Sequence, residues 1–177
     1  MRVRLAGVVL AATTAACTPP DPKAHLKITE IETYWAVDNP RGNTQYLAPV
    51  VRFRLHNQTT STLRAVDAQA AFSRAGEVNK DENKWPALLL VATGRKPLAG
   101  GDSVFVELKS EGRYSMYDTT PEDMMKSEAF KDARAEIYLR EGSSPWVKME
   151  EVAVERRIGA RSAVLPVVPI VPLAEPR

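Results

Sequence analysis

Residues 47–57, which read LAPVVRFRLHN, alternate between apolar and polar side chains, and this pattern constrains the fold more than any other in the chain. A period of two is that of a β-strand that buries one face and exposes the other. The polar residues 57–62 then predict a turn, and alternation returns in residues 63–73. The residues predicted to face inward are Leu47, Pro49, Val51, Phe53, Leu55, Val66, Ala68, Ala70 and Phe72. We therefore expect two neighbouring strands at the centre of the fold.

Further alternating or apolar stretches predict strands at residues 26–37, 85–91, 103–110, 133–141 and 146–158. The alternation of the first stretch slips near Glu30, which predicts a β-bulge. Its adjacent Tyr34 and Trp35 must point to opposite faces, so one of them faces outward or covers an edge. One helix is predicted, because Thr120 can cap a helix that begins at Pro121 and runs to about residue 130. About seven strands and one short helix are typical of a mainly β, immunoglobulin-like sandwich of two sheets.

The N-terminus has the features of an export signal. Arg2 and Arg4 form a short basic region, and residues 5–12 (LAGVVLAA) are apolar. A membrane-spanning helix needs about 20 apolar residues, and this stretch is much shorter. Residues 1–16 are therefore predicted to direct export and to be removed, rather than to span a membrane.

The end of this segment, Thr14-Ala15-Ala16-Cys17, resembles a bacterial lipobox, in which small residues precede a cysteine that becomes lipidated. The resemblance implies a lipoprotein that is anchored to a membrane through Cys17. Because Thr18 rather than an aspartate follows, it implies an outer-membrane protein that faces the periplasm if the cell is Gram-negative. The alternative is ordinary signal cleavage, which would leave Cys17 as a free thiol.

Three further segments are expected after the signal. Residues 17–25 contain several prolines, which favour an extended tether. Residues 26–160 contain the predicted sandwich, and residues 161–177 form a second proline-rich stretch that is expected to be extended. Cys17 is the only cysteine, so no disulfide can form within the chain and the core alone must stabilise the domain.

Charge and motifs argue against several classes of function. Without Arg2 and Arg4 the 24 basic residues become 22, equal to the 22 acidic residues, and a neutral domain is not expected to bind nucleic acid. No nucleophile motif, phosphate-binding loop or metal-ligand spacing is found. The two histidines, His25 and His56, are predicted to lie in the tether and on an outward strand face. We therefore expect no enzyme activity, no cofactor and no metal site.

The segment from residue 114 to residue 125 is the strongest candidate for a binding surface. It holds Tyr114, Met116, Tyr117, Met124 and Met125, and therefore three of the five methionines of the chain. Tyrosine and methionine are enriched at protein interfaces, because they combine adaptable apolar area with polar or polarisable atoms. The alternative is a crossover connection that packs these side chains onto the edge of the sandwich.

Residues 51–57 (VRFRLHN), the polar turn, the strand through Phe72 and the later Gly76 resemble a recurrent bacterial pattern. The pattern is similar to the FxLYD-type and late-embryogenesis-type immunoglobulin-like domains of secreted lipoproteins. In those domains an asparagine like Asn57 starts the turn, and a glycine-containing turn like that at Gly101 precedes a later strand. The resemblance covers about half of the mature chain and bears on fold. The function we expect is a lipid-anchored module that recruits another envelope protein; the alternative is a periplasmic carrier of a small ligand or lipid, with a cavity between the sheets.

Overall fold

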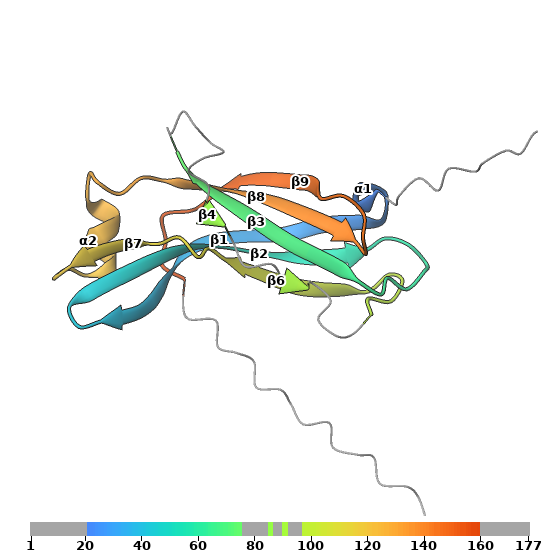
Figure 1. Cartoon of the computed structure of the whole chain (residues 1–177), viewed down its shortest axis with the longest axis horizontal. Helices are drawn as coiled ribbons and strands as arrows, with labels where there is room; N and C mark the ends of the chain where they lie inside the picture. Colours follow the sequence, from blue (N-terminus) through green and yellow to red (C-terminus); the bar gives the residue numbers. More distant parts are fainter. Residues whose placement is uncertain (1–20, 76–84, 87–89, 92–96, 160–177) are drawn as a thin grey trace, which may run out of the picture.

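The structure, a computed structural model, describes residues 21–75, 85–86, 90–91 and 97–159. Over these residues the chain forms two antiparallel sheets that pack face to face as a β-sandwich (Figure 1). The strands are β1 (Leu26–Arg41), β2 (Thr44–Asn57), β3 (Val66–Arg74), β4 (Trp85–Pro86), β5 (Leu90–Val91), β6 (Ser103–Lys109), β7 (Tyr114–Tyr117), β8 (Ala133–Glu141) and β9 (Val147–Ala153). The helices are α1 (Pro22–His25) and α2 (Pro121–Lys126). Seven of the described strands have four or more residues, which confirms the predicted mainly β sandwich.

The first sheet is built around β2. The long strand β1 pairs with one side of β2, from Leu26 opposite Asn57 to Arg41 opposite Thr44. Strands β6 and β7 follow one another along the other side, β6 beside the second half of β2 and β7 beside its first four residues. The second sheet has the order β9, β8, β3, with the short β4 and β5 beside β3.

The predicted alternation is confirmed by burial in β3 and in the second half of β2, whereas residues 47–51 of β2 are all buried. Phe53 and Leu55 on β2 and Phe72 on β3 are fully buried, whereas Arg52 and Arg54 are only half-buried. The inward residues of β8, among them Ile137, meet them from the second sheet. The core therefore lies between the two sheets, and its side chains come from the period-two positions of the sequence.

The bulge predicted near Glu30 is present. The register of β1 against β2 shifts between Thr29 and Glu32, and Glu30 adopts a left-handed backbone conformation with φ of 50°. The shift changes the parity of β1, so that Thr33 and Trp35 face the core. Trp35 is fully buried there, and Tyr34 points to the outer face.

The structure has two described helices where the sequence predicted one. Residues 22–25 form α1 rather than the end of an extended tether. Asp21 caps this helix by accepting the backbone N–H of Lys23 at 3.0 Å, and Pro22 is buried. Proline fixes a backbone angle that suits the first helical position, which is the same property that suggested an extended chain. Residues 21–25, predicted to belong to the tether, are therefore part of the described fold.

Helix α2 begins where it was predicted but is shorter. Thr120 accepts the backbone N–H of Asp123 at 3.1 Å, and Pro121 is the first helical residue. The helix ends at Lys126 instead of about residue 130, because Ser127 has an extended ψ of 140°. The chain then turns back, with the Phe130 N–H bonded to the Ser127 carbonyl, and brings Phe130 into the core.

Candidate partner-binding surface

The segment predicted to bind a partner begins with a strand rather than with an irregular crossover. Tyr114–Tyr117 forms β7, in register with Leu47 to Thr44 of β2. Its side chains alternate: Tyr114 and Met116 point inward, and Ser115 and Tyr117 are exposed. Alternate residues of β7 thus face the core and the solvent, as the period of a strand requires.

Tyr114 belongs to a cluster of aromatic rings at one end of the core. Its ring centroid lies 5.7 Å from that of Trp35, 5.4 Å from that of Trp85 and 4.9 Å from that of Phe130. The hydroxyl group donates to the Lys131 carbonyl at 3.2 Å and accepts the Lys131 N–H at 3.1 Å. Tyr114 therefore stabilises the fold and offers little surface to a partner.

Met124 and Met125 were candidates for the binding surface, with packing onto the sandwich as the alternative, and the structure places them in the core. They are only 1% and 8% exposed. Helix α2 is short, and its two consecutive methionines pack against the open end of the sandwich, where they join the core cluster. The reason is geometric, because a helix that closes the end of a sandwich must bury its apolar residues there. Met116 is partly buried against the same cluster.

Tyr117 is the one predicted residue that remains free for a partner. Its side chain is 70% exposed, the highest value among the described large hydrophobic residues. It lies opposite Thr44, beside the turn between β1 and β2. Asp118, which follows, has a left-handed backbone with φ of 52° and donates its N–H to the Asn43 carbonyl at 2.9 Å. These contacts hold Tyr117 at a defined position.

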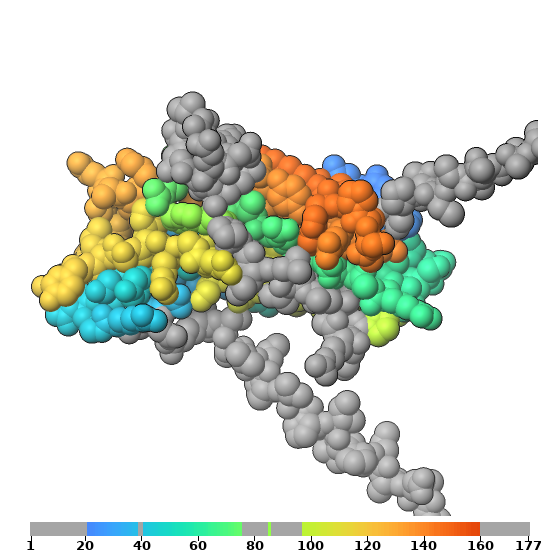
Figure 2. All heavy atoms as spheres, in the orientation of Figure 1, coloured from blue at the N-terminus to red at the C-terminus, as the bar shows by residue number. Residues whose placement is uncertain are grey.

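Further polar and aromatic groups lie on the same face of β2 and β7. Tyr46 is opposite Ser115, and the Arg113 guanidinium lies over the Tyr46 ring at 4.5 Å. Asp38 carboxylate oxygens accept from Arg113 and from Lys109, each at 3.1 Å. We call the group of Tyr46, Arg113, Ser115 and Tyr117 the tip surface. In the space-filling view, the yellow segment that contains β7 and the cyan β1–β2 turn form one end of the molecule (Figure 2).

A second exposed aromatic residue was not singled out from the sequence. Phe105 on β6 is 45% exposed, and the guanidinium carbons of Arg52 and Arg54 lie 4.6 and 4.0 Å from its ring centroid. The available signal was its parity, since Phe105 alternates with the inward Val104 and Val106 and so must face outward. An aromatic residue at an outward strand position is a candidate contact residue.

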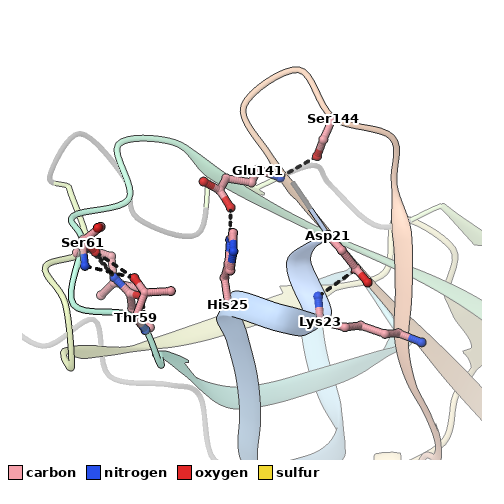
Figure 3. A network of polar contacts seen from close by, with 9 residues as sticks. Asp21, Lys23, His25, Thr59, Ser61, Glu141 and Ser144 are labelled. Carbon is pink, nitrogen blue, oxygen red and sulfur yellow. Dashed lines mark hydrogen bonds and ion pairs between the residues drawn. The ribbon is translucent and has the colours of Figure 1, made fainter. Parts of the chain in front are cut away.

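The opposite end of the sandwich carries a polar network around α1 (Figure 3). His25 Nδ1 lies 3.1 Å from Glu141 Oε2, and the His25 carbonyl accepts the Gln58 N–H at 2.8 Å. The Ser144 hydroxyl accepts the Glu141 backbone N–H at 3.1 Å. His25, predicted in the tether, is therefore fixed to the folded domain. We call this region, which comprises α1 and the turns that contact it, the α1 end.

Two depressions lie at or near this end, and both are open to solvent. One, of about 530 Å³, is lined by residues 62–65 and 141–144. The other, of about 540 Å³, includes Lys27, Thr29 and His56, with the His56 Nε2 at 2.8 Å from the Thr29 hydroxyl. The first lies at two turns and the second on the outer face of the first sheet beside a turn, so neither lies between the sheets. Neither depression is the enclosed cavity between the sheets that a small-ligand carrier would need.

No group of three or more His, Cys, Asp and Glu residues suited to a metal ion occurs in the described part of the chain. None of the helices in that part is both long and apolar enough to cross a bilayer. Cys17 and the proline-rich residues 160–177 lie outside the described residues, so their predicted roles stay predictions.

Comparisons with known proteins do not assign a family. No family model matches the sequence, and no curated protein matches it. An X-ray structure of a Northeast Structural Genomics Consortium target is similar over 83% of this chain and 95% of that chain, with 8% identity and a TM-score of 0.42. An exo-β-N-acetylglucosaminidase of Vibrio harveyi in complex with N-acetylglucosamine matches 75% of this chain but only 19% of its own length, with 12% identity and a TM-score of 0.26. Likenesses at this level carry no functional argument.

Proposed function

We propose that this protein is a lipid-anchored binding or assembly module of the cell envelope, which recruits another envelope protein through the tip surface and performs no catalysis. The observation that carries the proposal is the placement of the two ends. Helix α1, where the chain enters the domain, and β7, which carries Tyr117, lie at opposite ends of the long axis of the molecule (Figure 1). An anchor at Cys17 would therefore leave the tip surface away from the membrane.

The short segment between Cys17 and the folded domain supports this arrangement. Only three residues separate Cys17 from Asp21, the first described residue and the N-cap of α1. Four Cα-to-Cα steps span at most about 14 Å. The predicted tether of residues 17–25 is shortened because residues 22–25 belong to α1. The reach toward a partner then comes from the length of the sandwich itself and not from a long linker.

The composition of the tip surface suits protein recognition. Tyrosine and arginine are enriched among the residues that dominate binding energy at interfaces. Tyr117 offers a large apolar area at a low cost in conformational entropy, because it has few rotatable bonds and its backbone is held by hydrogen bonds. Ser115 and Arg113, both exposed, add polar contacts around it.

The experiment is site-specific photo-crosslinking in the native cell. A benzoylphenylalanine replaces Tyr117 in one variant and Glu150, an exposed residue of β9, in the control. We expect a discrete adduct with one envelope protein from position 117 and none from position 150. Equal adducts from both positions, or none from position 117, would reject the tip surface.

The anchor is tested separately by fractionation of wild type and Cys17→Ala. We expect the wild type to sediment with membranes and the variant to be released. If both versions are released, the lipid anchor is wrong, and a free periplasmic carrier becomes the better explanation.

A further inference from the structure

We propose that the outer face of the first sheet around Phe105 rests against the phospholipid headgroups of the membrane that holds the anchor, so that the domain is tilted with its α1 end down. We call Phe105, Arg52 and Arg54 the headgroup contact. The inference rests on the proposed lipid anchor at Cys17. It adds a second membrane contact, made by the folded domain, and an orientation for the tip surface.

The chemistry of the headgroup contact suits a membrane interface. Phe105 presents an apolar ring, and two guanidinium groups lie within 4.6 Å of its centroid. Guanidinium binds phosphate through charged hydrogen bonds with favourable geometry. Arg52 lies opposite Glu32 on β1 and Glu107 on β6 but forms no ion pair with a carboxylate among the described residues, so its guanidinium can take a phosphate without breaking one. Arg54 is held in place by Glu30 at 2.8 Å.

The position of the contact follows from the strand register. Lys27, His56 and Ser103 form the row of the first sheet that adjoins α1, and Lys27 comes two residues after His25. Phe105 is the next outward residue on β6, about 7 Å further along the strand. The anchor cannot lie more than about 14 Å from Asp21, because only four Cα-to-Cα steps separate them. The length of chain outside the domain therefore holds this row close to the bilayer.

The tip surface lies on the same face but beyond the reach of the headgroups. Arg54 and Tyr46 are eight residues apart on β2, which corresponds to about 27 Å along the strand. A tilted domain can therefore place Phe105 against the membrane while Ser115 and Tyr117 stay in water. A domain that lies flat would bring both ends of the face to the bilayer.

Acidic and basic side chains are mixed on this face, so its attraction to the membrane acts only at short range. Lys27, Arg52 and Arg54 share the face with Glu32 and Glu107, and Glu30 joins them through its ion pair with Arg54. These carboxylates offset the basic side chains, so long-range attraction to anionic lipid is weak. We therefore expect the Cys17→Ala protein to bind vesicles poorly. The headgroup contact orients a domain that the lipid has already brought to the membrane.

The test uses spin labels on the full-length lipidated protein in vesicles of phosphatidylethanolamine and phosphatidylglycerol. Ser103→Cys and Ser115→Cys form a matched pair, since both serines are exposed on the same face and at opposite ends. The lipidated Cys17 sulfur is a thioether and is not labelled. The measurement is relaxation of each label by a water-soluble nickel complex and by oxygen dissolved in the bilayer.

We expect the label at position 103 to be severalfold better protected from the nickel complex than the label at position 115. Phe105→Ser should reduce that protection, whereas Tyr117→Ser should not. A flexible Gly/Ser insertion between Pro20 and Asp21 should also reduce it while the protein still floats with the vesicles, because the domain is then no longer held at the bilayer.

The outcomes separate the inference from the proposal on which it rests. If the protein floats with vesicles but the two labels are equally exposed to nickel, the headgroup contact is wrong and the anchor stands. If both labels are protected, the domain lies flat, and the tilt and the free tip surface are both overturned. If the wild type does not float, or floats no better than Cys17→Ala, the anchor fails and the inference fails with it.

Discussion

Asn57 is the residue that joins the two turns next to α1. It is only 1% exposed, and its Nδ2 group donates to the carbonyls of Ser61, Leu98 and Ala99 at 2.7 to 3.1 Å. Its Oδ1 accepts from the N–H of Thr59 at 3.0 Å and from the Thr59 hydroxyl at 2.8 Å. The sequence resemblance placed an asparagine at the start of this turn, and the structure shows what its side chain does there.

We predict that Asn57→Ala lowers the free energy of unfolding by about 3 kcal/mol, because it removes all the hydrogen bonds that this buried side chain makes to the two turns. Gln58→Ala is the matched control, since Gln58 is the next residue and is exposed, and we expect it to change stability by less than about 0.5 kcal/mol. Urea denaturation measures both. A loss below about 1 kcal/mol for Asn57→Ala would show that water replaces its hydrogen bonds.

Tyr34 points to the outer face of the first sheet and is nevertheless buried. Gly159 packs on its ring, where a Cβ atom would overlap the ring atoms, and the Gly159 N–H donates to the Trp35 carbonyl at 3.0 Å. The Tyr34 hydroxyl donates to Glu107 Oε2 at 3.0 Å. Burial and the Glu107 charge raise the pKa of Tyr34 to about 12.

This shift predicts a pH dependence of stability. The pKa of Tyr34 in the unfolded chain is the ordinary value of about 10. The stabilisation is therefore fully present below about pH 10 and is lost as the pH rises toward about 12, because the unfolded state releases the proton first. Tyr34→Phe cannot ionise, so its stability should fall less steeply over that range. Urea titrations at several pH values compare the two slopes, and parallel slopes would contradict the prediction.

At the scale of elements, α2 and β7 show how one segment can combine core and surface. Strand period decides which residues of β7 face inward, and the position of α2 at the end of the sandwich decides the burial of its methionines. Sequence composition could identify the enrichment in Tyr and Met, but it could not separate these two uses. Of the five predicted residues, only Tyr117 is exposed.

We predict that Met124→Ala lowers the free energy of unfolding by about 3 kcal/mol, since it opens a cavity at a side chain that is 1% exposed. Lys126→Ala, on the exposed side of the same helix, should change it by less than about 0.5 kcal/mol, because its ion pair with Asp123 is in solvent. Thermal denaturation measures both. A small loss for Met124→Ala, together with a weaker crosslink from position 117, would assign Met124 to the binding surface instead.

At the scale of the whole molecule, the two exposed aromatic residues lie at different places along the long axis. Phe105 lies near the α1 end, and Tyr117 lies beside the turn at the opposite end. The two proposed contacts therefore lie at different ends of the domain. A contact with lipid and a contact with protein can then be made at the same time, because they do not compete for the same residues.

Much of the fold follows from local chemistry, and those parts were predicted. Strand period placed β2, β3 and β8, a phase slip located the bulge near Glu30, and Thr120 with Pro121 marked the start of α2. Each of these signals depends on residues close together in the chain. The short helix α1 and the pairing of β7 were missed, because buried Pro22 and the partner strand of Tyr114 are contacts with distant parts of the sequence.

By itself, the sequence determined that the chain is a mainly β sandwich without a disulfide, because alternation and cysteine content are local properties. It also supplied the prediction of an anchor at Cys17. Only the tertiary structure decided which of the predicted contact residues reach solvent, that residues 22–25 form a helix, and that Phe105 and Tyr117 lie far apart on one face. Exposure and separation depend on how distant segments pack, and no short stretch of sequence contains that information.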